Sequence, residues 1–200
     1  DAAFRLMAGG KHTGKVVVAF ADAFVSRKGE PPLPVFAVKP EGTYLITGGL
    51  GGLGRVLAEW LVDCGARHLV LSSRSGASTP EAAAFVERLQ GRGVEARVIK
   101  ADIGSPKDVK RLIKQAQSAS APLKGVFHLA MVIDDAPLSA LTTARLQTVM
   151  APKAHGAWLL HENTREMELD CFVMFSSVSS IFGNPAQGNY AAANAFLDSL

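Results

Sequence analysis

From residue 43 onward, short apolar runs alternate along the chain with longer stretches in which apolar positions recur at helical spacing. The apolar runs predict buried strands at residues 43–47, 68–72, 96–100, 125–129 and 172–176. The helical stretches cover residues 52–64, 80–91, 106–118, 138–164 and 187–200. Largely apolar strands separated by helices are typical of a parallel sheet covered on both faces. The pattern therefore predicts a doubly wound α/β fold, in which ligands bind beyond the carboxyl ends of the strands.

Local signals support the predicted helices. Thr79 and Ser105 each stand directly before a proline, which is typical of a capped helix N-terminus. The long stretch 138–164 holds one or two helices, and Pro152 predicts a break near its own position. Residues 52–64 are identified as an amphipathic helix by one apolar stripe, formed by Leu53, Val56, Leu57, Trp60 and Leu61.

The N-terminal part of the chain has a different character. Residues 1–20 end in an apolar, strand-like run at 16–20, and residues 29–40 carry one glycine and four prolines. Such a proline-rich stretch holds neither a regular helix nor a central strand. We therefore expect a linker between the first residues and the alternating region.

Composition disfavours several classes of function. The 200 residues carry 21 Lys and Arg against 18 Asp and Glu, and no run of five like charges occurs. A nucleic-acid-binding surface needs clustered basic residues, and a membrane span needs an apolar run of about 18 residues, which is absent. Cys64 and Cys171 lack the spacing of a disulfide or, with five scattered histidines, of a zinc site. This cysteine usage fits the reducing cytoplasm.

A glycine-rich turn follows the first predicted strand and opens the first predicted helix. Within residues 47–54, Gly49, Gly51 and Gly54 match the Gly-x-Gly-x-x-Gly fingerprint of dinucleotide-binding proteins. The glycines permit a tight turn and a close approach of the backbone to a pyrophosphate, which then faces the helix N-terminus. A flexible loop is the alternative, but the strand before the turn and the helix after it favour nucleotide binding.

The second and third strands bear on which nucleotide is bound. Arg74 follows Gly54 by 20 residues, where an NAD-binding protein carries an acidic residue for the ribose 2′-hydroxyl. A guanidinium there suits the 2′-phosphate of NADPH, with Ser73 as a further donor, and a solvated surface arginine is the alternative. Asp102 either accepts a hydrogen bond from the adenine amino group or caps a turn beside Gly104.

Four further residues have the pattern of a carbonyl reductase. Tyr190 and Asn194 stand four apart on one helix face, Ser177 precedes Tyr190 by 13 residues, and Lys153 lies at a helix start. Carbonyl reduction needs a proton donor and a second group that orients the oxygen. A phenol of pKa ~10 becomes a useful acid only near a cation, which Lys153 can supply. Each residue alone has a structural interpretation, so the prediction depends on their joint spacing.

Together these motifs resemble the catalytic half of a ketoreductase domain from a modular polyketide or fatty-acid synthase, a Rossmann-like branch of the short-chain dehydrogenase/reductases. The resemblance covers residues 42–200 and rests on the stretches 47–54, 71–76, 101–103, 127–130, 152–156, 175–177 and 189–194. It implies that Tyr190 is the proton donor, that Ser177 bonds the carbonyl, and that Lys153 and Asn194 support them. In this branch, as here, the lysine comes from the preceding helix.

The resemblance also implies an NADPH-dependent 3-oxoacyl reductase acting on chains tethered by phosphopantetheine to an acyl carrier protein. The residues expected to bind the cofactor are Thr47, Gly48, Gly49, Leu50, Gly51, Gly52, Leu53, Gly54, Ser73, Arg74, Asp102, Ile103, Leu129 and Ala130. Ile133, Asp134 and Asp135 resemble the subtype that forms the D-3-hydroxyacyl product, and Phe182 stands where the opposite subtype has tryptophan. A solvated acidic loop is the alternative for the two aspartates.

The same resemblance predicts the domain organisation. Residues 1–20 resemble the closing segment of an enoylreductase domain, residues 21–41 form a linker, and residues 42–200 form a ketoreductase that we expect to be incomplete at its C-terminus. The enoylreductase and the structural half of the ketoreductase are then partners in cis, within a homodimeric synthase. Two alternatives stay open, a catalytically silent nucleotide-binding domain and a free-standing reductase of small ketones. The complete set of catalytic residues disfavours the first, and the enoylreductase-like segment disfavours the second.

Overall fold

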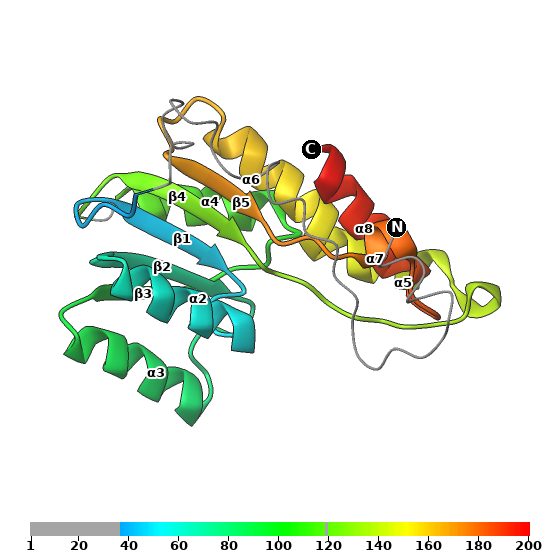
Figure 1. Ribbon diagram of the computed structural model, residues 1–200, viewed down its shortest axis with the longest axis horizontal. Coiled ribbons are helices and arrows are strands. Elements are labelled where there is room, and N and C mark those ends of the chain that lie inside the picture. Colours follow the sequence, from blue (N-terminus) through cyan, green and yellow to red (C-terminus); the bar gives the residue numbers. More distant parts are fainter. Residues whose placement is uncertain (1–36, 119) are drawn as a thin grey trace, which may run out of the picture. The chain divides into compact units, whose positions relative to one another are not determined.

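The computed structural model describes residues 37–118 and 120–200 (Figure 1). The chain separates into two units, Asp1–Val35 and Phe36–Leu200, and the described residues belong to the second. The segment predicted to resemble an enoylreductase, 1–20, and most of the predicted linker lie outside the described residues.

A five-stranded parallel sheet, in the order β3-β2-β1-β4-β5, forms the centre of this unit. The strands are β1 Thr43–Thr47, β2 His68–Ser73, β3 Glu95–Lys100, β4 Leu123–His128 and β5 Cys171–Met174. β1 pairs in parallel with β2 on one side and with β4 on the other, so the strand order reverses beside β1. The predicted doubly wound α/β fold is confirmed, and its ligand site is expected where β1 and β4 end.

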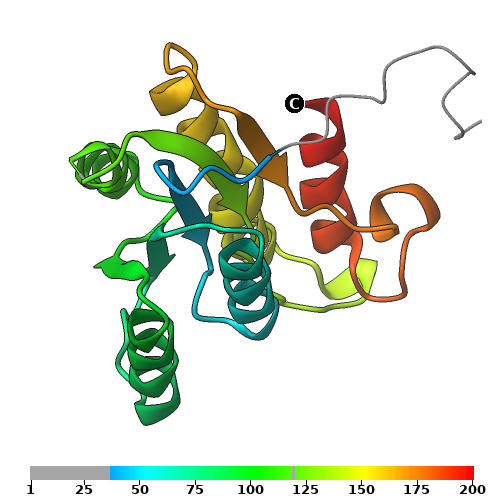
Figure 2. The ribbon, with the colours of Figure 1, turned by 60° about the vertical axis from the view of Figure 1, so that its left-hand side comes forward.

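Helices cover both faces of the sheet (Figures 1 and 2). They are α2 Gly52–Asp63, α3 Pro80–Gly91, α4 Pro106–Gln117, α5 Thr143–Met150, α6 Gly156–Thr164, α7 Ser179–Phe182 and α8 Gly188–Ser199, with short turns η1 Leu138–Ala140 and η2 Ala151–His155. Among the described residues no helix combines the length and the apolar character that a membrane span requires. The predicted caps are present, since Thr79 accepts a hydrogen bond from the Ala82 N–H and Ser105 from the Asp108 N–H.

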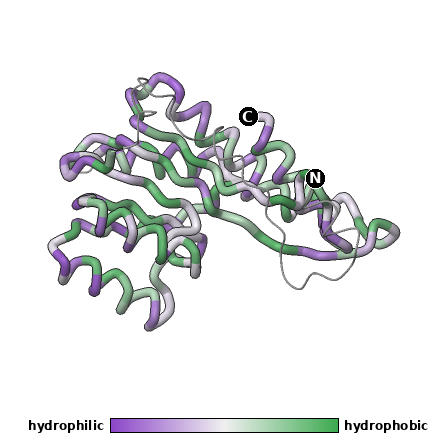
Figure 3. The backbone as a smooth tube through the Cα atoms, viewed as in Figure 1, coloured by the Kyte–Doolittle hydropathy of each residue, from purple (hydrophilic) through white to green (hydrophobic). Residues whose placement is uncertain are grey.

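The side chains of β1 point alternately to the two faces of the sheet, and the core has one layer on each face. Tyr44 and Ile46 pack with α2 and α3 on one face, whereas Leu45 packs with α4 and α6 on the other. Successive side chains of a strand point to opposite faces, which explains why a strand covered on both sides is apolar throughout. Figure 3 shows the strands accordingly as mostly hydrophobic segments of the chain.

Helix α2 packs through only part of the apolar stripe that identified it, namely Leu57 and Leu61. Leu53, Val56 and Trp60 are 58%, 61% and 49% exposed, and the side that faces the sheet carries Gly54 and Ala58 with Leu61 and Val62. The cause is the glycine turn, because a Cβ on Gly54 would lie 2.4 Å from the Gly48 carbonyl oxygen. The helix therefore approaches the sheet through its smallest residues.

Pro152 does not break the helix in which it lies. Helix α5 continues through the π-helical turn η2 directly into α6, so residues 143–164 form one helical rod. Proline lacks the N–H that an α-helix needs, and its ring excludes the carbonyl four residues earlier. Widening by one residue into a π-turn accommodates the ring without ending the helix. The predicted break at Pro152 was therefore wrong.

Candidate active site

The glycine turn between β1 and α2 has the crowding that only glycine permits. Gly48 adopts a φ of 69°, and a Cβ on Gly54 would lie 2.7 Å from the Gly49 Cα atom. By contrast, a Cβ on Gly52 would meet no atom within 4 Å, so the N-terminus of α2 opens to solvent. Unpaired N–H groups at such a terminus form an anion-binding site, which suits a pyrophosphate.

Thr47 ties this turn to the end of β4. Its buried Oγ1 accepts hydrogen bonds from the backbone N–H groups of Leu129 and Ala130, both at 3.2 Å. The Gly49 N–H donates to the Ser72 carbonyl at 3.2 Å, which fixes the turn against β2 as well. Three strand ends are thus held together at the point where the strand order reverses.

A cavity of about 300 Å³ lies at these strand ends. Its lining comprises Gly48, Gly51, Ser72, Ser73, Arg74, Ser75, Ala101, Asp102, Ile103, Leu129, Ala130, Met131, Val132 and Pro152. Eight of the predicted cofactor-binding residues are therefore brought to one cavity. Arg74 is exposed at its edge, while the Asp102 carboxylate accepts a hydrogen bond from the Gly104 N–H at 2.9 Å. The turn-capping role considered for Asp102 is thus present, and the residue lines the cavity too.

A second cavity of about 240 Å³ adjoins the first, with which it shares Gly48, Gly51, Leu129 and Met131. Its other lining residues are Gly52, Leu53, Gly54, Lys153, Phe175, Ser176 and Tyr190. The glycine turn therefore lies beside the predicted tyrosine and lysine. The sequence assigned no role to Met131, Phe175 or Ser176, because nothing in their local pattern distinguishes them from strand-end residues.

Lys153 is the most deeply buried charged residue of this site, with 3% of its surface exposed. Its Nζ donates a hydrogen bond to the Phe175 carbonyl at 2.8 Å and lies 5.3 Å from the centre of the Tyr190 ring. Burial lowers the pKa of Lys153 from 10.5 to about 8, and the Asp198 carboxylate partly opposes that shift. A cation is therefore held next to the phenol through the neutral pH range.

Helix α8 presents three polar residues at intervals of four, Tyr190, Asn194 and Asp198. The fully buried Asn194 donates from Nδ2 to the Tyr190 carbonyl at 2.8 Å, and its Oδ1 has no hydrogen-bond partner among the described residues. The hydroxyls of Ser176 and Ser180, followed by the charge of Lys153, lower the pKa of Asp198. Asp198 was not singled out from the sequence, although its spacing from Tyr190 was the available signal.

Ser177 lines neither of the two cavities. Its Oγ accepts hydrogen bonds from the Ser179 N–H at 3.2 Å and the Ser179 hydroxyl at 3.0 Å, just before helix α7. This is the structural role of a turn serine. The hydroxyl proton of Ser177 stays available for donation, so its predicted catalytic role stays a prediction.

The residues predicted for stereocontrol also lie outside both cavities. Asp134 forms an ion pair with Arg145 at 2.9 Å, and an Asp135 carboxylate oxygen accepts from the Gln187 amide at 3.0 Å. Asn189 donates to the Asp134 carbonyl at 2.8 Å, which ties this loop to the first turn of α8. Ile133 and Phe182 are exposed.

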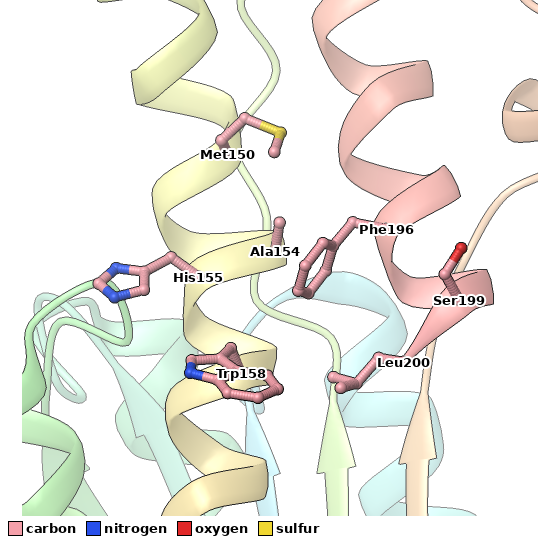
Figure 4. A pocket seen from close by; sticks show the side chains of 7 residues that line it. All are labelled: Met150, Ala154, His155, Trp158, Phe196, Ser199 and Leu200. Carbon is pink, nitrogen blue, oxygen red and sulfur yellow. The ribbon is translucent and has the colours of Figure 1, made fainter.

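A larger hollow, of about 610 Å³, lies elsewhere, between the α5–α6 rod and α8 (Figure 4). Its lining residues are Met150, Ala154, His155, Trp158, Phe196, Ser199 and Leu200. Figure 4 shows Ala154 and Phe196 turned into the space between the helices. None of the predicted site residues lines it, so volume alone does not locate the chemistry.

Comparison with known proteins decides the family, because the family described as KR domain matches residues 42–200. The chain belongs to this family of ketoreductase domains. The relatives of this ketoreductase domain are polyketide synthases. It is 44% identical over 198 residues to a highly reducing polyketide synthase of Purpureocillium lilacinum, a match that covers 99% of this chain and 8% of that protein.

A second relative and a solved structure support the same family. The chain is 43% identical over 200 residues to one component of the phenolphthiocerol/phthiocerol polyketide synthase of Mycobacterium tuberculosis, covering 99% of this chain and 9% of that protein. Among solved structures, an N-terminal ketoreductase from the macrolactin assembly line has a TM-score of 0.77 at 39% identity, over 81% of this chain and 33% of that one. The ketoreductase chain thus spans a small part of the length of these curated relatives.

The ketoreductase fold implies a nicotinamide dinucleotide cofactor. The residues present fit such a group. The open N-terminus of α2 suits its pyrophosphate, the glycine turn lets the backbone approach closely, and the adjoining cavities run from Arg74 to Tyr190.

Proposed function

We propose that this ketoreductase domain uses NADPH to reduce the 3-oxo group of an acyl chain held by phosphopantetheine on an acyl carrier protein. The observation that carries the proposal is the position of buried Lys153, 5.3 Å from the ring of Tyr190, in a cavity that adjoins the glycine turn. A proton donor beside a cation, next to a dinucleotide-binding turn, is what carbonyl reduction requires.

The glycine turn and the ends of β2 and β3 bind the cofactor in this proposal. NADPH supplies the hydride when it is bound. The N-terminus of α2 binds the pyrophosphate, and Arg74 binds the 2′-phosphate through charge-assisted hydrogen bonds. Asp102 gives one carboxylate oxygen to Gly104 and keeps the other for the adenine amino group. Ile103, Leu129 and Ala130 form apolar and backbone walls of the cavity.

Tyr190 is the proton donor in this proposal. As the carbonyl oxygen gains negative charge, Tyr190 gives it the phenolic proton, so that the ketone becomes an alcohol and the phenol a phenolate. The Lys153 ammonium stabilises that phenolate, and Ser177 donates a second hydrogen bond to the carbonyl oxygen. Asn194 Oδ1, which lacks a partner among the described residues, accepts from Lys153 or from a water that returns the proton.

The relatives bear on the setting of the reaction. The matches cover 8% and 9% of two curated polyketide synthases, which supports a place within a multidomain synthase. We further propose that this synthase is cytoplasmic and acts as a homodimer. Its cis partners are the structural half of the ketoreductase and an enoylreductase whose closing segment is residues 1–20, joined through the linker 21–41. Ile133, Asp134 and Asp135 guide the substrate toward the D-3-hydroxyacyl product, opposite the subtype that has tryptophan at the position of Phe182.

A catalytically silent nucleotide-binding domain is the second candidate. The buried Lys153 argues against it, because a lysine kept out of water at the cost of a lowered pKa is expected where its charge has a use. A free-standing reductase of small ketones is disfavoured by the length of the curated relatives.

The experiment that tests the proposal supplies the whole synthase with NADPH and a 3-oxoacyl thioester of a pantetheine analogue. We expect NADPH to be consumed in step with formation of the 3-hydroxyacyl thioester. NADPH binding without any reduction would establish the silent domain instead. Equal kcat/KM for a simple cyclic ketone and the thioester would contradict a specificity for tethered acyl chains and favour a reductase of small ketones.

A further inference from the structure

His128, the last residue of β4, connects two parts of the site that are far apart in the sequence. It is 1% exposed, its Nδ1 lies 2.8 Å from Thr47 Oγ1, and its Nε2 lies 2.9 Å from the Lys153 carbonyl oxygen. It lines neither of the two cavities at the glycine turn, so its side chain acts on the site through such hydrogen bonds, while its backbone carbonyl accepts from the Phe175 N–H at 3.1 Å.

The hydrogen bonds around Thr47 determine where the imidazole proton lies. Thr47 Oγ1 already accepts from the Ala130 N–H and from the Leu129 N–H, which it shares with the Thr47 carbonyl, so both of its acceptor positions face backbone donors. Its own proton therefore goes to His128 Nδ1, which must be unprotonated. The single ring proton is then on Nε2 and donates to the Lys153 carbonyl. Burial lowers the pKa of His128 to about 4, so the ring is neutral at physiological pH.

The Lys153 carbonyl lies in the π-turn η2, where Pro152 has widened the helix. This carbonyl accepts from the Gly156 N–H and also faces the His128 side chain. The same residue sends its Nζ to the Phe175 carbonyl at 2.8 Å. Its backbone carbonyl is therefore bonded from β4 as well as within the turn, and its side-chain end is bonded to the end of β5.

We propose that His128 is a positioning residue: it fixes the Lys153 backbone against the Thr47 end of β1 and so holds the Lys153 ammonium beside Tyr190. This inference rests on the reduction proposed above. Three titratable groups face Lys153, namely His128 from β4 and Tyr190 and Asp198 from α8. His128 differs from the other two because it acts on the backbone of Lys153.

Two amide variants separate the two hydrogen bonds of the imidazole. In His128→Gln the longer side chain places its amide near the position of Nε2 and keeps a donor for the Lys153 carbonyl. In His128→Asn the shorter side chain reaches only the Nδ1 position and keeps a partner for Thr47. Both variants carry the same polar group into the same buried place, so each controls for the other.

We expect the kcat of His128→Asn to fall of order ten- to a hundredfold, the scale of a misplaced catalytic group, while His128→Gln recovers most of that loss. The Kd for NADPH should be alike in the two variants, because the glycine turn keeps its backbone bonds. A kcat for His128→Asn equal to or above that of His128→Gln would overturn the inference. So would a loss confined to NADPH affinity.

Thermal unfolding shows whether each His128 variant folds, and Pro152→Ala supplies an independent test of the same contact. If neither histidine variant folds, Pro152→Ala restores the helical N–H, favours a regular α-turn and withdraws the Lys153 carbonyl from His128. We expect a lowered kcat, and an unchanged kcat would overturn the inference. Tyr190→Phe is measured alongside. Full turnover by Tyr190→Phe would refute the proposed function, whereas its inactivity beside a fully active His128→Asn would refute only the role of His128.

Discussion

The Nζ atom of Lys153 lies 5.3 Å from the centre of the Tyr190 ring, with the lysine almost wholly buried. Burial lowers the pKa of Lys153 to about 8, so its ammonium is present below that pH and is lost above it. We therefore expect kcat for reduction to fall as the pH rises through about 8. In a pH–rate profile, Lys153→Met should lose of order 10²-fold in kcat together with this basic limb.

The exposed Lys110 on α4 supplies a matched control, since Lys110→Met removes a cation that has no part in the site. The pH–rate profile of Lys110→Met should match that of the unmodified protein. Turnover that stays level on both sides of pH 8 in the unmodified protein would contradict a role for the Lys153 charge.

Arg74 decides the choice between the two nicotinamide cofactors. Arg74→Ala removes charge-assisted hydrogen bonds of ~1.5–3 kcal/mol, so NADPH affinity should fall of order ten- to a hundredfold while NADH affinity hardly changes. Arg74→Asp should go further, because a carboxylate repels the 2′-phosphate and accepts from the 2′-hydroxyl. Titration of both cofactors measures this, with Arg92→Ala, an exposed arginine paired with Asp63, as the control. Equal losses for NADH and NADPH would mean that Arg74 supports the fold only.

Gly54 is expected to be irreplaceable. In Gly54→Ala the new Cβ would lie 2.4 Å from the Gly48 carbonyl oxygen, so α2 or the turn must move. We expect a loss of about 1–3 kcal/mol in the free energy of unfolding, typical of overpacking, and a large loss of NADPH affinity. Gly91→Ala, where a Cβ meets nothing within 4 Å, is the matched substitution and should be neutral or stabilising. Similar melting temperatures and NADPH affinities in both variants would show that the turn tolerates a side chain.

Much of this arrangement could be predicted from the sequence because it follows from local chemistry. The strands, the capped starts at Thr79 and Ser105, and the glycine turn each follow from short patterns. The face of α2 that packs on the sheet could not be predicted, because Gly54 and Ala58 pack by being small and leave no apolar signal. The π-turn at Pro152 could not be predicted either, because it depends on the helices at both of its ends.

In the candidate site, too, some features could be predicted from the sequence and others could not. Tyr190, Lys153 and the glycine turn were expected together, and they line one cavity. Asp198, Met131 and the hydrogen bonds of His128 were not predicted, because they depend on how strand ends and helices meet across the fold. The polar partners of Asp134 and Asp135 likewise come from segments distant in the sequence.

The configuration of the product tests the loop that holds Asp134 and Asp135. We expect the D-3-hydroxyacyl product to predominate, because these residues resemble the subtype that forms it. Chiral chromatography of the released acid measures the ratio directly. Arg145→Ala, which removes the ion pair with Asp134, should lower that ratio if the loop guides the substrate. Predominance of the L product would refute this assignment.

The most direct test of the central claim compares the two tyrosines of the chain in the whole synthase. Tyr190→Phe removes only the phenolic hydroxyl, and with it the proton donor, so kcat should fall ~10²–10⁴-fold with an unchanged Kd for NADPH. Tyr44→Phe makes the same chemical change within β1, at the end of the strand away from the glycine turn, where the hydroxyl bonds the Lys39 backbone, and should keep its turnover. Loss of turnover in Tyr190→Phe alone is the result that we predict. Near-normal turnover by Tyr190→Phe would contradict its role as the proton donor.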